Sequence, residues 1–175
     1  MAPLRKTLGR RDSPWVVSLK ALLDTLDKPT IACWCLQEAE QHMLPIFEKR
    51  CPGDDRPRLA LQACRDWFKG KVKLPYVKDI ILNGCHAAAR QLDHDPAAQA
   101  AARACGQAAS CCHVAAHALG LSFYGTAAIA YDTLGTHQSA KVYNQLAARE
   151  TARMEADLRM IAAEAGQDSR KSENP

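Results

Sequence analysis

Two histidines, His113 and His117, have the spacing in this 175-residue chain that comes nearest to a known metal chemistry. Residues four apart on a helix share a face, and two imidazoles placed in this way can bind one zinc ion. The catalytic form of that site needs a glutamate directly after the first histidine, where this chain has Val114. The further candidate ligands are guesses: Glu40, His86 and His137. We therefore predict no metal and no other cofactor.

The histidines would extend a polar stripe if residues 97–118, which are mostly Ala, Gly and Cys, formed one helix. Spacings of three and four would align Arg103, Gly106, Ser110, His113 and His117. Unpaired buried polar groups cost about 1–3 kcal/mol each, so a buried stripe needs partners, for which Glu40 and Glu48 are the candidates. We define the polar seam as five residues: Glu40, Arg103, Ser110, His113 and His117.

Two interpretations of the polar seam stay open. In the first, it is a hydrogen-bond network between helices, and the protein is not an enzyme. In the second, the surroundings of Arg103, His113 and His117 hold a small ligand or a metal, and the protein could be an enzyme. The direction of the two histidine side chains decides between them, because a ligand site needs both to face a shared cavity.

Arginines supply a second kind of candidate site. In the segment 54–58 (DDRPR), the aspartates suit the N-terminus of a helix, and the arginines can pair with them or with Glu48. Guanidinium groups also offer forked donors to the oxyanions of an acidic partner, and arginine is frequent among the residues that carry binding energy. The candidate partner-binding residues are Arg56, Arg58, Arg65 and Arg90.

Signatures of the common catalytic sites are missing from the sequence. It contains no phosphate-binding glycine loop, no nucleophile elbow and no dinucleotide fingerprint. Cys112 and His113 are adjacent, so on a helix their side chains would point about 100° apart, which argues against a thiol–imidazole dyad. The formal charge of +4 is mild and the charges are interspersed, so we expect no nucleic-acid partner.

The compartment follows from the apolar segments and the cysteines. No apolar stretch is long enough to span a bilayer, and the first residues lack the apolar region of a secretion signal. We therefore expect a cytoplasmic protein without a membrane partner, whose eight cysteines remain reduced and mostly act as small buried side chains. The sequence leaves the oligomeric state open.

Cap and proline signals predict an all-α, single-domain bundle of about six to seven helices. We expect helices over about 14–26, 27–51 with a kink at Pro45, 55–70, 75–92, 96–118, 123–134 and 138–165. No run of alternating β-branched residues indicates a sheet. Residues 1–12 should form a flexible basic arm, 13–165 the helical domain, and 166–175 a disordered tail. Trp67 is expected to anchor the core.

An ordered set of segments resembles the immunity proteins of bacterial polymorphic toxin systems, in the group similar to the fifth class of such immunity domains. The segments are LPIFE at 44–48, Asp54 with RPR at 56–58, ACR at 63–65 with Trp67 and Gly70, AAAR at 87–90 and the alanine-rich stretch 101–117. The resemblance covers about residues 30–130. It implies a small all-helical protein that binds and neutralises a cognate toxin without catalysis, and it brings no catalytic residue or cofactor.

Overall fold

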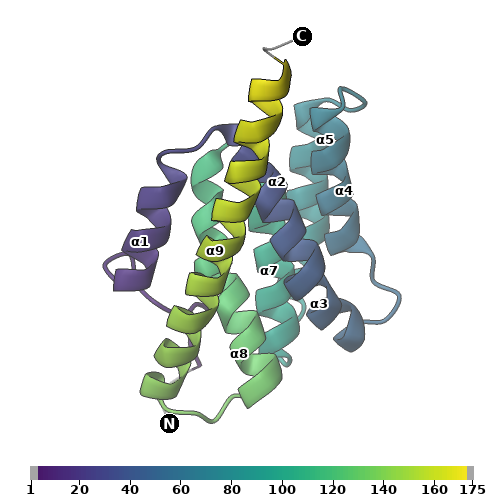
Figure 1. The fold of residues 1–175 in the computed structure, drawn as a ribbon. Coiled ribbons are helices and arrows are strands. Elements are labelled where there is room, and N and C mark those ends of the chain that lie inside the picture. Colours follow the sequence, from purple (N-terminus) through teal and green to yellow (C-terminus); the bar gives the residue numbers. More distant parts are fainter. Residues whose placement is uncertain (1–3, 173–175) are drawn as a thin grey trace.

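The computed structural model describes residues 4–172, and within that range the chain is α-helical without a β-strand (Figure 1). Together with the π-helical and 3-10 stretches that join some of them, the α-helices of this range make up seven continuous helical segments in one bundle, which confirms the predicted fold class. The α-helices are α1 (Pro14–Leu23), α2 (Lys28–Glu38), α3 (Leu44–Arg50), α4 (Arg56–Phe68), α5 (Leu74–Asp79), α6 (His86–Arg90), α7 (Pro96–Ser110), α8 (Thr126–Leu134) and α9 (Ala140–Ser172). The described part of the chain contains no helix that is both long and apolar enough to cross a membrane.

Local signals set the starts of most helices. Prolines occupy the first turn of α1, α2, α4, α5 and α7, where the missing backbone N–H has no helical partner to lose. Asp27 accepts a hydrogen bond from the Thr30 backbone N–H at 2.8 Å, and Asp95 accepts one from that of Ala98 at 3.1 Å. These caps satisfy N–H groups that a helix leaves free at its start.

In two of the expected helices, a π-helical stretch lies between two α-helical parts. Between α2 and α3 lies η1 (Ala39–Met43), so the interruption expected at Pro45 takes the form of a π-turn just before this residue. Between α5 and α6 lies η2 (Ile80–Cys85). A π-turn inserts one extra residue, so it rotates the side chains that follow relative to those before it.

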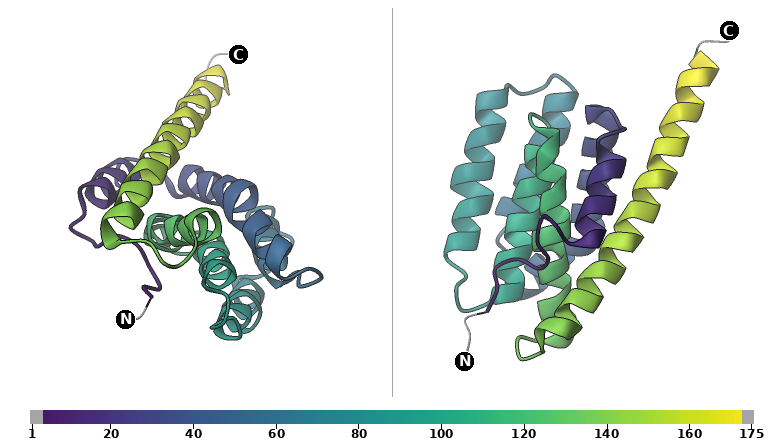
Figure 2. Two further views of the ribbon diagram at one scale, coloured as in Figure 1. Left: turned by 90° about the horizontal axis from the view of Figure 1, so that it is seen from below. Right: turned by 90° about the vertical axis from the view of Figure 1, so that its left-hand side faces the viewer.

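Helix α7 is the central element of the bundle (Figure 2). It contacts α2, α3, α4, α6 and α8, and its alanines pack in both hydrophobic clusters of the core. The small side chains allow these neighbours to approach closely. All of its residues are buried except Pro96, Arg103 and Gln107, so these two polar side chains are its only long ones with access to solvent.

The helix expected over 96–118 is wrong in its second half. α7 ends at Ser110, and the chain turns before the short 3-10 segment η3 (Ala115–Ala118) and the π-helical η4 (Leu121–Gly125). No glycine or proline lies between Gln107 and Leu119 to signal this end. The turn accompanies a tertiary contact, in which the Cys111 thiol lies 3.3 Å from that of Cys35 on α2.

Both ends of the described chain differ from the expectation. In the segment 4–12, Leu8 lies against the bundle: it is only 1% exposed, and its N–H donates to the Phe123 carbonyl at 3.1 Å. The Tyr131 hydroxyl also donates to the Arg5 carbonyl. At the other end, α9 continues to Ser172, through most of the segment expected to be a disordered tail. Residues 1–3 and 173–175 lie outside the described residues.

The long helix α9 crosses the bundle obliquely, and its last turns extend beyond the neighbouring helices (Figure 2). It contacts α1, α2 and α8. Trp34 on α2 is fully buried and donates its indole N–H to the Met154 carbonyl at 3.1 Å. Trp34 is therefore the tryptophan that anchors the core, whereas Trp67 is only partly buried beside the exposed Phe68.

Candidate functional site: a basic cluster on the central helix

Arg103 is the one partly buried arginine without a carboxylate partner in the part of the chain whose side chains are described. Its Nε atom is shielded from solvent and has no hydrogen-bond partner. The other partly buried arginines are each held by at least one carboxylate: Arg50 by Asp95 and Asp132, Arg56 by Asp54, Arg65 by Glu40, and Arg153 by Glu38, Glu150 and Asp157. Arg103 therefore carries a charge that the described structure does not compensate.

His86 lies beside Arg103 because Gly106 leaves room for its ring. A Cβ atom at Gly106 would stand 2.5 Å from Cε1 of the imidazole, which is closer than such atoms ever approach. The His86 Nδ1 atom is also shielded from solvent and has no partner. Burial lowers the pKa of His86, and the charges of Arg103, Arg90 and His117 lower it further. The ring thus lies close to three basic groups.

Gln107 and His117 border the same cluster. Nδ1 of His117 lies 2.9 Å from the Gln107 side-chain oxygen, and a Cβ at Gly120 would meet the Gln107 side chain at 2.5 Å. The ring of His113 has its centroid 5.6 Å from that of His117. Burial, followed by the charge of His113, lowers the pKa of His117. We define the basic cluster as His86, Arg90, Arg103, His113 and His117.

The polar seam expected from the sequence is only partly present. Because α7 ends at Ser110, His113 and His117 lie on a turn and on η3 rather than along α7. The Ser110 hydroxyl donates to the Gly106 carbonyl at 2.8 Å and so bonds within its own helix. The acidic partners proposed for the seam are engaged elsewhere, with Glu40 on Arg65 and Glu48 on Arg58. The Glu40 carboxylate and the Ser110 hydroxyl thus have partners other than the residues of the basic cluster.

The four arginines singled out as partner-binding candidates fall into two groups. Arg56 binds Asp54 and donates to Gln91, Arg58 pairs with Glu48, and Arg65 pairs with Glu40. Arg90, in contrast, is exposed and its guanidinium has only a 3.5 Å contact with the Leu82 carbonyl. Of the four, Arg90 alone belongs to the basic cluster.

A second polar centre joins α9 to the start of the first π-turn. The oxygen and nitrogen atoms of Glu38, His42 and Asp157 lie within 4.8 Å of one another, a spacing that a metal ion could use. The guanidinium of Arg153 already binds all three, at 3.0 Å and 3.2 Å from the Glu38 oxygens, 3.2 Å from His42 Nε2 and 2.8 Å from Asp157. This geometry makes Arg153 the cation of the centre.

Charges and burial set the pKa values in this second centre. Burial raises the pKa of Glu38, whose side chain is 3% exposed, although the Arg153 guanidinium acts in the opposite direction. Burial also lowers the pKa of His42, as does the neighbouring Arg153. A neutral His42 ring then accepts a hydrogen bond from the guanidinium, which fits the observed contact.

The side chains of Cys112 and His113 lie closer together than two adjacent residues of a helix would place them. The thiol lies 3.6 Å from His113 Nδ1, because the two residues occupy a turn and not a helix. A hydrogen bond from Cys64 lowers the pKa of Cys112 to about 6, and contact with His113 contributes. The thiol has no exposed surface, however, since Cys112 is 0% exposed. A substrate would have no access to it in this conformation.

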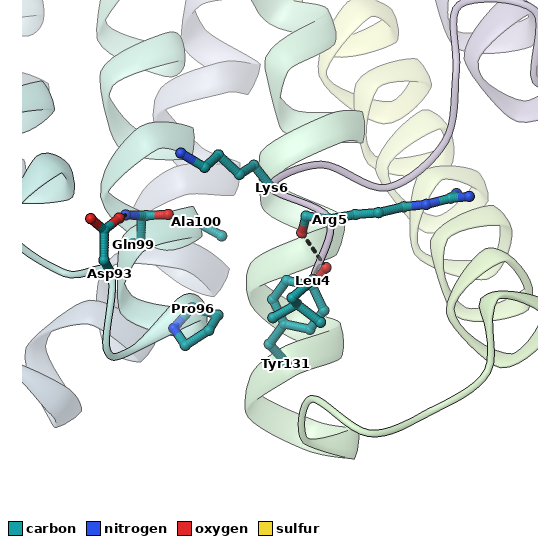
Figure 3. Close-up of a pocket in the computed structure, with 8 residues that line it drawn as sticks. All are labelled: Leu4, Arg5, Lys6, Asp93, Pro96, Gln99, Ala100 and Tyr131. Carbon is teal, nitrogen blue, oxygen red and sulfur yellow. Dashed lines mark hydrogen bonds between the residues drawn. The ribbon is translucent and has the colours of Figure 1, made fainter. Parts of the chain in front are cut away.

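Two neighbouring cavities lie beside the N-terminal residues, and Figure 3 shows the residues that line the first of them. The first has a volume of about 120 Å³ and is lined by Leu4, Arg5, Lys6, Asp93, Pro96, Gln99, Ala100 and Tyr131. Gln99 donates to Asp93 at 2.8 Å and to the Ala89 carbonyl at 2.9 Å, so these lining groups are paired within the chain. A neighbouring cavity of about 510 Å³ shares Tyr131 and includes His137.

Together, the fold and this site define a small all-α protein in which one basic cluster is left without a counter-charge. Residues 21–174 match the family described as "Imm-5 like putative immunity protein", and the chain belongs to this family. The match confirms the resemblance and lengthens it, because α9, outside the expected range of about 30–130, is part of the matched region. No curated protein and no solved structure matches the chain significantly.

Proposed function

We propose that this protein is a non-catalytic immunity protein that binds a cognate toxin and thereby protects the cell that makes it. The observation that carries the proposal is the family match, which extends over residues 21–174 and thus over every helix from α2 to α9. The toxin would be a bacterial one of the polymorphic type, and the site of action would be the cytoplasm. Binding would occur at a surface of the bundle and would require no cofactor.

Arginines on this surface remain the proposed contacts with the toxin: Arg56, Arg58, Arg65 and Arg90. Arg90 should contribute most, because it has no carboxylate partner to give up on binding, whereas the other three are already paired. Arginines that become desolvated at an interface are frequent among the few residues that carry most of the binding energy. We therefore expect Arg90→Ala to weaken toxin binding by about 2 kcal/mol, or roughly thirtyfold in Kd.

The test is co-expression with toxin-like products encoded beside this protein, followed by growth measurements and pull-down. The proposal expects one product that inhibits growth alone, is tolerated with this protein, and is recovered bound to it. Arg159→Ala is a matched control, because it removes the same charge from an exposed position on α9. If no neighbouring product binds, while the purified protein turns over or retains a small molecule, the alternative of a ligand-binding protein or enzyme is favoured.

A further inference from the structure

Three features of the basic cluster favour a bound anion: its charge has no counter-charge, two of its buried nitrogen atoms are unpaired, and neighbouring residues hold it in place. Its members come from different parts of the chain: His86 and Arg90 from α6, Arg103 from α7, and His113 and His117 from the turn and η3 that follow. Within the described residues, none of the five is paired with a carboxylate. The guanidinium charges of Arg90 and Arg103 thus have no counter-charge within the described residues, and an external negative charge would supply one.

Two buried nitrogen atoms in the cluster lack hydrogen-bond partners. They are Nε of Arg103 and Nδ1 of His86: these two atoms are shielded from solvent, although both residues are partly exposed. Folded proteins pair nearly all buried polar atoms, so an unpaired one calls for an explanation such as a bound group. For Arg103 the missing partner is an acceptor, because a guanidinium has donors only.

Neighbouring residues hold these groups in place, which distinguishes the cluster from a set of mobile surface charges. The Cβ-free surface of Gly106 seats the His86 ring against α7, one turn from Arg103 on the same helix. Gln107 holds His117 through the 2.9 Å contact with Nδ1 and is itself packed against Gly120. Arg103 and Gln107 are also the only long polar side chains of α7 with access to solvent. Packing against the central helix α7 therefore holds the basic cluster in place where α7 has access to solvent.

We propose that Arg103, His86, Arg90 and His117 form a binding site for an oxyanion, namely a carboxylate or a phosphate group, that comes from outside the chain. The planar fork of a guanidinium matches the two oxygens of such a group, and a second arginine with imidazole donors completes the coordination. The site is distinct from the Arg153 centre, whose cation is already neutralised by Glu38, Glu150 and Asp157.

The proposal stands on the geometry of the chain alone and does not depend on the proposed function. One source of the oxyanion is an acidic side chain of the toxin, and another is free phosphate. The first test uses inorganic phosphate and acetate with the isolated protein, so its failure would leave toxin binding untouched. Conversely, an absence of toxin binding would leave the anion site standing.

The experiment is a titration of ¹⁵N-labelled protein with sodium phosphate or sodium acetate, compared with sodium chloride at equal ionic strength. We expect a saturable shift of the Arg103 Nε–H and His86 ring resonances with phosphate or acetate, and only a weak linear drift with chloride. Bound phosphate should also raise the pKa of His86, because it offsets the nearby charges of Arg103, Arg90 and His117. The thermal midpoint should rise by about 3–6 °C at phosphate concentrations roughly tenfold above Kd.

Two variants separate the site from general charge effects. Arg103→Met keeps the apolar stem and removes the guanidinium, and it should abolish the saturable response. Arg159→Met removes the same charge from an exposed position on α9 and should leave the response unchanged. The proposal is overturned if neither phosphate nor acetate gives a saturable response, or if Arg103→Met responds like the unchanged protein. Once a toxin is identified, competition between phosphate and the toxin would show that an acidic group of the toxin occupies the site. Toxin binding that phosphate does not affect would show that the site binds a free anion.

Discussion

The two arginine centres of this protein differ in how their charge is compensated. Arg153 on α9 is held by three carboxylates and by His42, and its bidentate contact with the buried Glu38 bridges two helices far apart in sequence. Arg103 on α7 is comparably half-buried, yet it has no carboxylate at all. The charge of one centre is neutralised within the chain, whereas the charge of the other has no carboxylate partner among the described residues.

The difference shows how, in a protein without a catalytic signature, a charged side chain that stabilises the fold can be distinguished from one that binds a partner. Burying a charge is costly, and a chain that uses the charge only for stability supplies the partner itself. The arginines at 50, 56, 65 and 153 follow this rule. Arg103, on the central helix α7, departs from it, because the described residues provide no carboxylate for its partly buried side chain.

The largest expected effect is the loss of the Arg153 centre. Arg153→Met should lower the free energy of unfolding by about 3–5 kcal/mol near neutral pH, because it leaves Glu38 buried without its cation. Urea denaturation measures this loss. A double variant with Glu38→Gln should recover much of the stability, since no uncompensated carboxylate remains. A loss below about 1 kcal/mol in the single variant would contradict the view that this centre is structural.

The packing beneath the basic cluster should respond next. Gly106→Ala should destabilise the fold by about 1–3 kcal/mol, because the added Cβ would meet the His86 ring at 2.5 Å. Gly84→Ala is a matched control on a helical segment, where the nearest atom, Cβ of Arg56, lies 3.9 Å away, and it should be neutral or slightly stabilising. His86→Ala in the Gly106→Ala background should recover part of the loss. Equal effects of the two glycine variants would refute this account of the cluster.

Acidification should weaken the fold through histidines in both centres. The pKa values of His42 and His86 in the folded protein are lowered, first by burial and then by neighbouring arginines. The unfolded chain therefore takes up these protons first, so stability present above about pH 6.5 is lost as the pH falls through and below that value. Unfolding free energies measured from pH 8 to 5 test the sign. His86→Ala should flatten the dependence, and a rise in stability on acidification would be the opposite of this expectation.

The smallest effect distinguishes the two arginines most directly. Arg103→Met should change the free energy of unfolding by no more than about 0.5 kcal/mol in chloride buffer, with any change toward greater stability, because no internal partner loses a bond. The same denaturation assay that is used for Arg153→Met provides the comparison. A loss of more than about 1.5 kcal/mol would show that Arg103 is held within the chain and would remove the contrast between the centres.

Helix positions followed from local signals, and the exceptions show where these signals end. The prolines and the aspartates at 27 and 95 marked the helix starts because caps act within one turn. The end of α7 at Ser110 had no such mark, since the turn accompanies a contact between Cys111 and the distant Cys35. Trp67 and Trp34 are equally apolar in sequence, and only packing against α9 makes Trp34 the buried one.

The candidate site was foreseen in part. Arg103, His113 and His117 were predicted to be neighbours from their spacing on one helix. The ring centroids of His113 and His117 lie 5.6 Å apart although that helix ends early, and Arg103 lies on α7. His86 entered only as a guess at a metal ligand, and its position depends on the contact with Gly106, 20 residues further along the chain. The Arg153 centre was missed entirely, although Glu38 with His42 and Arg153 with Asp157 are both spaced four apart.

By itself, the sequence determined that the chain is all-α and where most helices begin. These properties depend on backbone caps and side-chain size, which act over a few residues. Only the tertiary structure decided which charges are neutralised. A pair such as Glu38 and Arg153 forms between residues 115 positions apart, and Arg103 is unpaired because no acidic side chain of the described fold reaches it. Compensation of buried charge is a property of three-dimensional neighbours, which local spacing does not specify.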